Sequence, residues 1–170
     1  MNFFIIYLPY LMSKKNVDTK KSPHRRSAEK AETRIMVFGT FDGLHPGHID
    51  FLKQAKNLIE NSFLIVSIAR DRNVLGIKGR YPDKNELARM ALVEKCKLVD
   101  KVVLSGARNH LPHIVKICPD IIALGYDQKA YVANLKKDLK NRGILTKIIR
   151  LKPFKERIYK NHLLKINKKI

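Results

Sequence analysis

Apolar and polar residues alternate in two different rhythms between residues 34 and 151 of this chain. Short apolar runs rich in β-branched residues indicate buried strands, whereas apolar residues that recur every three or four positions indicate helices. The runs that predict strands are 35–38, 63–69, 99–104, 119–124 and 144–151. The segments that predict helices are 47–60, 82–98, 107–118 and 132–142. This alternation predicts right-handed βαβ units and a Rossmann-like, three-layer α/β fold with a mainly parallel five-stranded sheet.

The chain before this region does not follow the alternation. Residues 2–12 form an apolar run interrupted by Pro9, which is shorter than the roughly 20 residues that a membrane-spanning helix needs. Residues 13–33 are polar and basic, which is typical of a solvated tail. We therefore expect residues 1–33 to be a disordered extension with no membrane role, and residues 34–170 to form one folded domain.

The first predicted strand leads through a glycine-containing turn to the start of the first predicted helix. Pro46 suits the first helical position, and the N–H groups and positive dipole at a helix N-terminus attract phosphate. His45 and His48 lie three residues apart across this start, where both can donate hydrogen bonds to phosphate oxygens. Gly39 and Gly47 allow the backbone to approach a ligand closely. A turn with two surface histidines is the alternative interpretation of the same residues.

The segment GTFDGLHPGH, residues 39–48, resembles the signature of the cytidylyltransferase-like nucleotidyltransferases. The resemblance implies transfer of a nucleoside monophosphate from a nucleoside triphosphate to a phosphate-bearing acceptor, with release of pyrophosphate. It also implies that the nucleotide contacts Gly39, Thr40, Phe41, Asp42, His45, Pro46, Gly47 and His48. We expect direct in-line attack, with both histidines stabilising the charge that develops on the phosphates. Asp42 lies nearest to the phosphates among the carboxylates, or else shapes the turn or meets the acceptor.

A second informative segment is PDIIALGYDQ at residues 119–128. Because the carboxyl ends of parallel strands share one edge, we expect Gly125, Tyr126 and Asp127 to bind the nucleotide beside the histidines, Asp127 through ribose hydroxyls or an adenine amine. Together with VSIARDRNV at residues 66–74, this segment resembles the archaeal-type FAD synthases. That resemblance implies transfer of AMP from ATP to FMN. A cytidylyltransferase that acts on a polyol or amino-alcohol phosphate is the alternative within the same class.

Two further basic residues belong to the expected site. Residues 76–80, GIKGR, are expected to form a mobile basic loop in which Lys78 neutralises the triphosphate and acts in catalysis. In the family that the chain resembles, a lysine of this loop is linked to phosphate binding. Glu86 and Arg89 fit the E-x-x-R pattern of that family, which implies that Arg89 faces the nucleotide. A solvated helical arginine is the alternative for this residue.

The C-terminal segment departs from the pattern of the family. There the family carries a Ser/Thr pair that opens a last helix and contacts the nucleotide phosphates. This chain has neither Ser nor Thr after Thr146, and it carries RIYKNHL at residues 157–163 instead. Asn161 can still cap a helix at this place, and we include it among the nucleotide-binding residues.

The charge of the chain supports a hypothesis of a different class. With a net charge of +20 and a pI of about 10.1, the protein attracts polyanions. The excess is largest in residues 129–170, where only Asp138 and Glu156 are acidic. This pattern fits a basic nucleic-acid-binding protein on a degenerate nucleotidyltransferase fold. The basic residues are not interleaved with aromatic side chains for base stacking, so nucleic acid is not the expected partner.

The expected partners are ATP or CTP and a phosphate-bearing acceptor, FMN by resemblance. Mg²⁺ or another divalent cation would bridge the triphosphate oxygens and keep several waters, so no dedicated protein ligands are expected. Cys96 and Cys118 show no metal-binding spacing and favour a reduced, cytoplasmic protein. His110 and His113, three residues apart, are expected at the surface. The sequence leaves open whether the protein forms a homodimer.

Overall fold

The computed structural model of the protein describes residues 32–107, 110–129, 132 and 134–154. Most of the expected extension, residues 1–31, lies outside the described residues, as does Asn161. None of the helices in the described ranges is long and apolar enough to cross a membrane.

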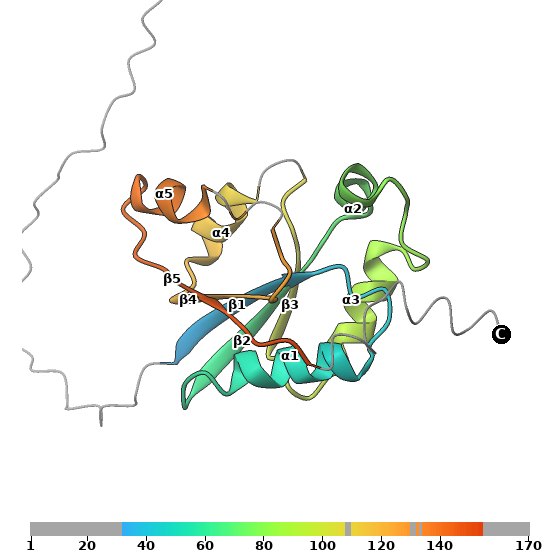
Figure 1. Cartoon of the computed structure of the whole chain (residues 1–170), viewed down its shortest axis with the longest axis horizontal. Helices are drawn as coiled ribbons and strands as arrows, with labels where there is room; N and C mark the ends of the chain where they lie inside the picture. The colour runs from blue at the N-terminus through green and yellow to red at the C-terminus, as the bar shows by residue number, and fades with distance from the viewer. Residues whose placement is uncertain (1–31, 108–109, 130–131, 133, 155–170) are drawn as a thin grey trace, which may run out of the picture.

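Five strands form one parallel sheet at the centre of the molecule (Figure 1). Their order is β3-β2-β1-β4-β5, and every neighbouring pair is parallel. The central strand β1 pairs with both β2 and β4, so the winding of the chain reverses between β1 and β4. The strands are β1 (Thr33–Gly39), β2 (Ser62–Ile68), β3 (Lys101–Leu104), β4 (Ile121–Leu124) and β5 (Lys147–Arg150). The predicted five-stranded parallel sheet is confirmed.

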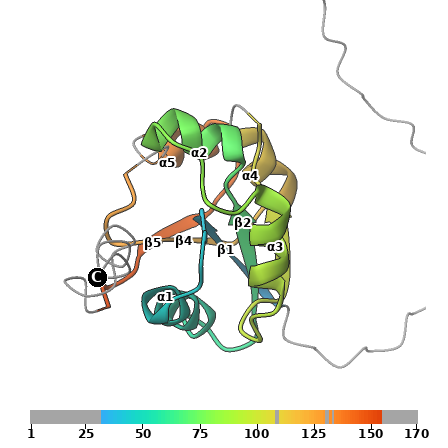
Figure 2. The same cartoon turned by 90° about the vertical axis from the view of Figure 1, so that its right-hand side faces the viewer.

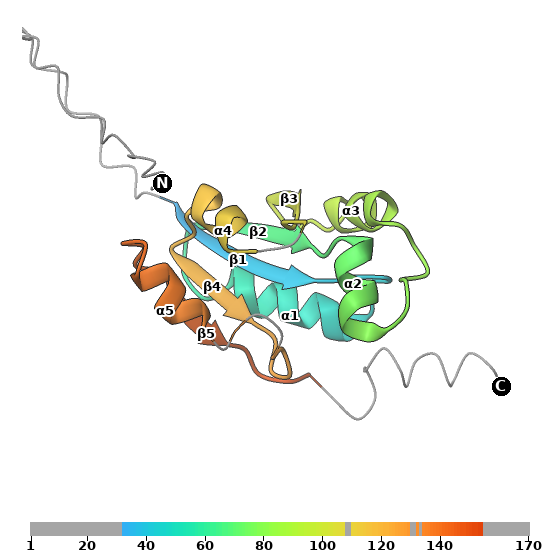
Figure 3. The same ribbon diagram turned by 90° about the horizontal axis from the view of Figure 1, so that it is seen from above.

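Helices cover both faces of the sheet (Figure 2). The helices are α1 (Pro46–Lys56), α2 (Asp71–Lys78), α3 (Glu86–Glu94), α4 (Leu111–Ile117) and α5 (Leu135–Lys140). One apolar core joins α1 and α3 to one face of the sheet, and a second joins α4 and α5 to the other face. Helix α2 lies beyond the carboxyl end of β1 (Figure 3). This arrangement confirms the predicted three-layer fold.

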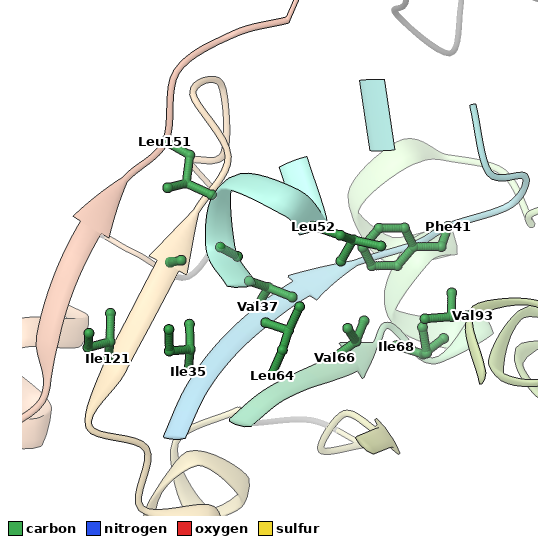
Figure 4. Close-up of a cluster of buried hydrophobic side chains, with 12 residues drawn as sticks. Ile35, Val37, Phe41, Leu52, Leu64, Val66, Ile68, Val93, Ile121 and Leu151 are labelled. Atoms are coloured by element: carbon green, nitrogen blue, oxygen red, sulfur yellow. The ribbon is translucent and has the colours of Figure 1, made fainter. Parts of the chain in front are cut away.

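Alternation along the central strand supplies both cores. Ile35 and Val37 of β1 pack on the side of α1 and α3, whereas Met36 between them packs on the side of α4 and α5. Figure 4 shows the first core, in which Leu52 of α1 and Val93 of α3 lie close to the strands. All five side chains are fully buried, and burying one such side chain contributes about 1.5–3 kcal/mol. The sheet is therefore a firm platform for the loops at its carboxyl edge.

The expectation of a mobile loop at residues 76–80 is wrong. The structure has helix α2 up to Lys78, and Gly79 ends it in the left-handed conformation with φ 68°. The Gly79 N–H donates to the Leu75 carbonyl oxygen at 2.8 Å, which is the usual way to close a helix at glycine. Val74 is the one buried residue of α2, and the sequence of this helix therefore lacks the apolar stripe by which a helix is predicted. As a result, Lys78 is held at the end of a helix.

The helix expected at residues 82–98 is shorter in the structure. It begins at Glu86 because the Asn85 side chain accepts a hydrogen bond from the Ala88 N–H at 2.8 Å and caps the helix. Pro82 therefore lies in the connection before α3. This connection runs past the end of β1 and carries part of the site described next.

Candidate active site

A cavity of about 710 Å³ opens at the carboxyl edge of the sheet. The ends of β1, β2 and β4 contribute to its wall, so it includes the point where the winding of the chain reverses. Ligands of open α/β sheets bind at this kind of position, and the volume suits a small-molecule site. The sequence-predicted site residues that line the cavity are Gly39, Thr40, Phe41, His45, Gly47, His48, Lys78, Gly125, Tyr126 and Asp127.

The two histidines of the signature stack on one another at the start of α1. The ring centroids of His45 and His48 lie 3.8 Å apart, with 26° between the ring planes. The Nδ1 atom of His48 lies 2.8 Å from the Gly43 carbonyl oxygen. A carbonyl oxygen only accepts, so Nδ1 of His48 carries a proton and donates it to this bond. The other ring nitrogen, Nε2, is then the atom that can bind a ligand.

The surroundings of His48 keep its ring neutral in the ligand-free protein. Burial lowers the pKa of His48 to about 4, and the neighbouring His45 and Lys78 act in the same direction. The hydrogen bond to the Gly43 carbonyl opposes them without cancelling their effect. A triphosphate in the cavity would bring negative charge and favour the protonated ring. Binding of an anion would therefore protonate Nε2 of His48, so that the ring gains a second N–H donor.

The start of α1 adds a second anion-binding feature. His45 is extended, with φ −122° and ψ 166°, and Pro46 occupies the first helical position. The His45 carbonyl oxygen accepts from the His48 N–H at 2.8 Å and from the Ile49 N–H at 3.1 Å. The N–H of Gly47 belongs to the first turn, where no intrahelical acceptor is available. The helix dipole and this N–H face the same end of the cavity as the histidines.

Gly39 and Phe41 depend on each other sterically. A Cβ atom added to Gly39 would lie 2.4 Å from the Phe41 ring, much closer than such atoms approach in proteins. Phe41 is 2% exposed, and its ring centroid lies 5.0 Å from that of His48. The glycine thus makes room for a core aromatic ring, and that ring supports His48.

Lys78, the last residue of α2, lines the cavity and contacts the first loop. Its Nζ atom donates to the Thr40 hydroxyl oxygen at 3.3 Å. Both residues line the cavity with the stacked histidines. The loop after β1 and the end of α2 therefore form one polar, cationic wall.

Asp42 shapes the loop after β1. It is not one of the described residues that line the cavity. Its carboxylate oxygens accept from the backbone N–H groups of Asp83 and Lys84, each at 2.8 Å. Of the roles expected for Asp42, the structure supports that of a residue that fixes a turn. Pro46 does not line this cavity either; it lines a shallower groove on the outer side of α1.

Arg89 does not face the cavity in this structure, contrary to the expectation for a nucleotide-contacting residue. Its side chain is fully buried. Its Nη1 atom donates to the Thr40 carbonyl oxygen at 2.6 Å, and Nη2 donates to the Ala69 carbonyl oxygen at 2.7 Å and to an Asp71 carboxylate oxygen at 2.6 Å. Nε donates to the Lys84 carbonyl oxygen at 3.0 Å. The guanidinium thus joins the loops after β1 and β2 to the start of α2.

The histidines at residues 110 and 113 are not surface residues. His110 lines the cavity, with its ring centroid 6.4 Å from that of Phe38, and the Nε2 atom of His113 lies 3.2 Å from the Ser67 hydroxyl. Burial lowers the pKa of both histidines. The signal that could have placed His110 is Ile114, a buried residue of α4, because positions four residues apart share a helix face.

Other cavity residues were not identified from the sequence. Asn73 and Ser105 line the cavity from α2 and from the end of β3. The Asn73 side chain donates to the Gly106 carbonyl oxygen at 2.8 Å, and the Ser105 hydroxyl accepts from the Arg70 N–H at 3.3 Å. No group of three or more His, Cys, Asp or Glu residues in the described ranges could hold a metal ion.

The fold and the site together define a class of protein. A parallel α/β sheet carries, at its switch point, a cavity whose cationic wall includes a helix N-terminus with two stacked histidines. This combination defines a Rossmann-like enzyme that acts on a phosphorylated ligand. Sequence comparison then identifies the family. The family model described as cytidylyltransferase-like matches residues 36–163, and this chain belongs to that family of nucleotidyltransferases.

Two named relatives of the chain support its assignment to this family. The chain is 45% identical to the FAD synthase of Korarchaeum cryptofilum over 122 residues, which are 71% of this chain and 82% of the relative. It is 43% identical to the FAD synthase of Methanosarcina barkeri over 124 residues, 73% of this chain and 86% of the relative. These matches confirm the resemblance seen in the sequence.

A solved structure shows the same fold. It is described as the lipopolysaccharide core biosynthesis protein from Thermoplasma volcanium, and it superposes with a TM-score of 0.67 at 37% sequence identity. The match covers 73% of this chain and 99% of that one. Nearly the whole of that solved structure therefore has a counterpart in this chain.

Proposed function

We propose that this protein is an FMN adenylyltransferase, which transfers AMP from ATP to FMN and releases pyrophosphate. The observation that carries this proposal is the stacked pair His45 and His48 at the start of α1, on a cavity that also contains the Gly125–Gln128 turn. The relatives named FAD synthase support the choice of substrates. The size of the cavity supports it as well, because the site must hold two large ligands at once.

The reaction follows from the position of these groups. A phosphate oxygen of FMN attacks the α-phosphorus of ATP, a new P–O bond forms, and the bond between the α-phosphorus and the bridging oxygen breaks as pyrophosphate leaves. His45 and His48 stabilise the negative charge that develops on the phosphoryl oxygens and on the leaving pyrophosphate. Lys78, which lines the same cavity, neutralises the triphosphate tail. Because the acceptor already carries its nucleophilic oxygen, no covalent enzyme intermediate is needed.

A divalent cation, Mg²⁺ by expectation, supplies charge neutralisation when it is bound with the triphosphate. Asp50 is a carboxylate in the wall of the cavity. It fits a cation that keeps most of its waters and takes few protein ligands. We further propose a cytoplasmic location, which the free thiols of Cys96 and Cys118 support.

The lining of the cavity favours a flavin over a polyol phosphate as acceptor. Opposite the cationic wall, apolar residues of β1, α4, β4 and α5 line the cavity: Phe38, Ile114, Leu124 and Leu135. Apolar walls suit planar ring systems, whereas a polyol would leave its hydroxyl groups without partners there. The cytidylyltransferase alternative therefore has less support from the site.

A substrate screen that measures pyrophosphate tests the proposal. We expect ATP with FMN to give pyrophosphate and FAD, and CTP with glycerol 3-phosphate to give neither product. The variant His48→Ala should lower kcat by about 10²–10³-fold, because it removes a donor to the transition state. If ATP, Mg²⁺ and FMN yield no FAD, the assignment of substrates is wrong. Full activity of His48→Ala would reject the mechanism.

A further inference from the structure

Arg150, the last residue of β5, binds the backbone of the turn that follows β4. Its Nη1 atom donates to the carbonyl oxygens of Gly125 at 2.7 Å, Tyr126 at 3.2 Å and Gln128 at 3.0 Å. These three turn residues line the cavity. Arg150 is not one of the described residues that line it. The guanidinium therefore contacts the turn from outside the cavity.

The pairing of the strands places Arg150 at this point. It pairs with Leu124, the last residue of β4, and the Leu151 N–H extends the ladder by donating to the Leu124 carbonyl oxygen at 2.8 Å. The Arg150 side chain thus begins level with the end of β4 and reaches the turn just after it. The same register continues along the whole of β4 and β5, from Ile121 opposite Lys147 to Leu124 opposite Arg150.

Three carbonyl oxygens that converge on one point repel each other electrostatically. A guanidinium relieves this repulsion because it is cationic and presents several donors in a fixed plane. Within the turn itself, the Gln128 N–H donates to the Gly125 carbonyl at 3.2 Å and the Gly125 N–H donates to the Gln128 side-chain oxygen at 3.3 Å. Arg150 thus supplies three of the hydrogen bonds that define the backbone of this turn.

The turn carries the acidic side chain that we expect to meet the nucleoside. An Asp127 carboxylate oxygen lies 3.8 Å from the position that a Cβ atom of Gly125 would occupy, so this side chain lies over the glycine. Its position depends on the backbone of the turn, which Arg150 holds. A shift of about 1 Å at such a group can cost up to about 10²-fold in rate.

We propose that Arg150 is a positioning residue that fixes the turn of residues 125–128 so that Asp127 meets the nucleoside of the triphosphate. The inference rests on the proposed function for the identity of the nucleotide. It assigns to Arg150 no contact with the substrate. Its effect on the substrate passes through the backbone of the turn.

The variant Arg150→Met tests this role because the fold should survive it. Arg150 is exposed, and water can hydrate the three carbonyl oxygens after the guanidinium is removed. We expect the thermal midpoint to change little. The KM for ATP should rise by about 10- to 100-fold, and kcat should change much less.

Two matched variants separate positioning from charge. Lys147→Met removes one positive charge from an exposed position of the same strand, and it should leave the KM for ATP close to the wild-type value. Arg150→Lys keeps the charge but loses the planar set of donors, so it should restore the KM only in part. Equal effects of Arg150→Met and Lys147→Met would overturn the proposal, since net charge would then explain both.

Equilibrium binding of ATP and CTP, measured by calorimetry with Mg²⁺ and without FMN, distinguishes this proposal from the proposed function. If the wild type binds ATP but makes no FAD, the acceptor is wrong, and the affinities of the variants still decide the role of Arg150. If Arg150→Met binds ATP as tightly as the wild type, the positioning role is rejected. A wild type that binds neither nucleotide rejects both proposals.

Discussion

At the scale of single residues, the site depends on His48, whose ring lies between two other rings. The centroid of His45 is 3.8 Å away and that of Phe41 is 5.0 Å away. This packing removes water from the ring and brings a second titratable group next to it, and both effects disfavour its protonation. The same contacts fix the position of the ring before any ligand arrives.

The low pKa of His48 should make the folded protein sensitive to acid. Its pKa is about 4 in the folded protein against 6.5 in a model peptide, so between these values the unfolded chain binds more protons than the folded one. The free energy of unfolding should therefore fall as the pH decreases from about 6.5 to about 4. Urea unfolding at several pH values measures this loss, and His48→Asn should reduce it.

The acid sensitivity should not vanish in His48→Asn, because the pKa values of His110 and His113 are lowered as well. His110→Asn serves as the comparison, since it removes a histidine at the opposite wall of the cavity. An unchanged pH dependence in His48→Asn would show that this ring titrates normally in the folded protein.

The contact between Gly39 and Phe41 gives a prediction about stability. In Gly39→Ala the new methyl group would meet the Phe41 ring at 2.4 Å, so we expect a loss of about 1–3 kcal/mol in the free energy of unfolding. Gly125→Ala is the matched control, because its methyl group would find its nearest neighbour at 3.8 Å. Urea unfolding compares the two variants. Equal stability would mean that the Phe41 ring moves aside without cost.

At the scale of secondary-structure elements, Arg89 holds three segments together with one buried guanidinium. It joins the loop after β1, the end of β2 and the start of α2, and its partner Asp71 is a residue of α2. The end of the same helix carries Lys78. A fully buried arginine with acceptors from several segments is thus the structural basis of the cationic wall.

Replacing Arg89 should therefore destabilise the whole domain. We expect Arg89→Met to lower the free energy of unfolding by about 3–5 kcal/mol, because Asp71 and three carbonyl oxygens lose their donor. Arg70→Met is the control, since Arg70 forms a partly exposed ion pair with Glu86 at 2.9 Å and should cost about 1 kcal/mol or less. Chemical unfolding of both variants provides the comparison, and similar losses would contradict the assigned role of Arg89.

The sequence predicted the elements that bury an apolar face and missed the one that does not. The strands and α1, α3, α4 and α5 contribute side chains to the two cores, and this burial requirement leaves a periodic pattern. Helix α2 buries only Val74 and contains Gly76, so its pattern is that of a loop. Similarly, spacing alone identified His45 and His48, whereas the burial of Arg89 depends on acceptors from distant segments that no local pattern reveals.

At the scale of the whole molecule, the cavity brings together residues that are far apart in the chain. Residues from the loop after β1, the end of α2 and the turn after β4 share its wall. The loop after β1 contributes Phe41 to the first core, whereas the end of α2 and the turn after β4 lie outside both cores. A ligand that fills the cavity therefore adds contacts between these three segments, which without the ligand meet only at their ends.

Binding of the nucleotide should accordingly stabilise the folded protein. With Mg²⁺ and ATP at about 100 times the dissociation constant, the expected gain is about 2.7 kcal/mol. A thermal-shift assay should show a higher midpoint with ATP than with CTP at the same concentration. A larger shift with CTP would favour the cytidylyltransferase alternative. RNA should give no comparable shift at physiological salt, because the cavity and not the basic surface accounts for the effect.

The stacking of His45 on His48 has a thermodynamic consequence for substrate binding. If the anion converts His48 to its cationic form, complex formation consumes a proton from the solution. The measured heat of binding should then vary with the ionisation enthalpy of the buffer, with a slope near one proton per site in the wild type and near zero in His48→Asn. Affinity for ATP should weaken as the medium becomes more alkaline.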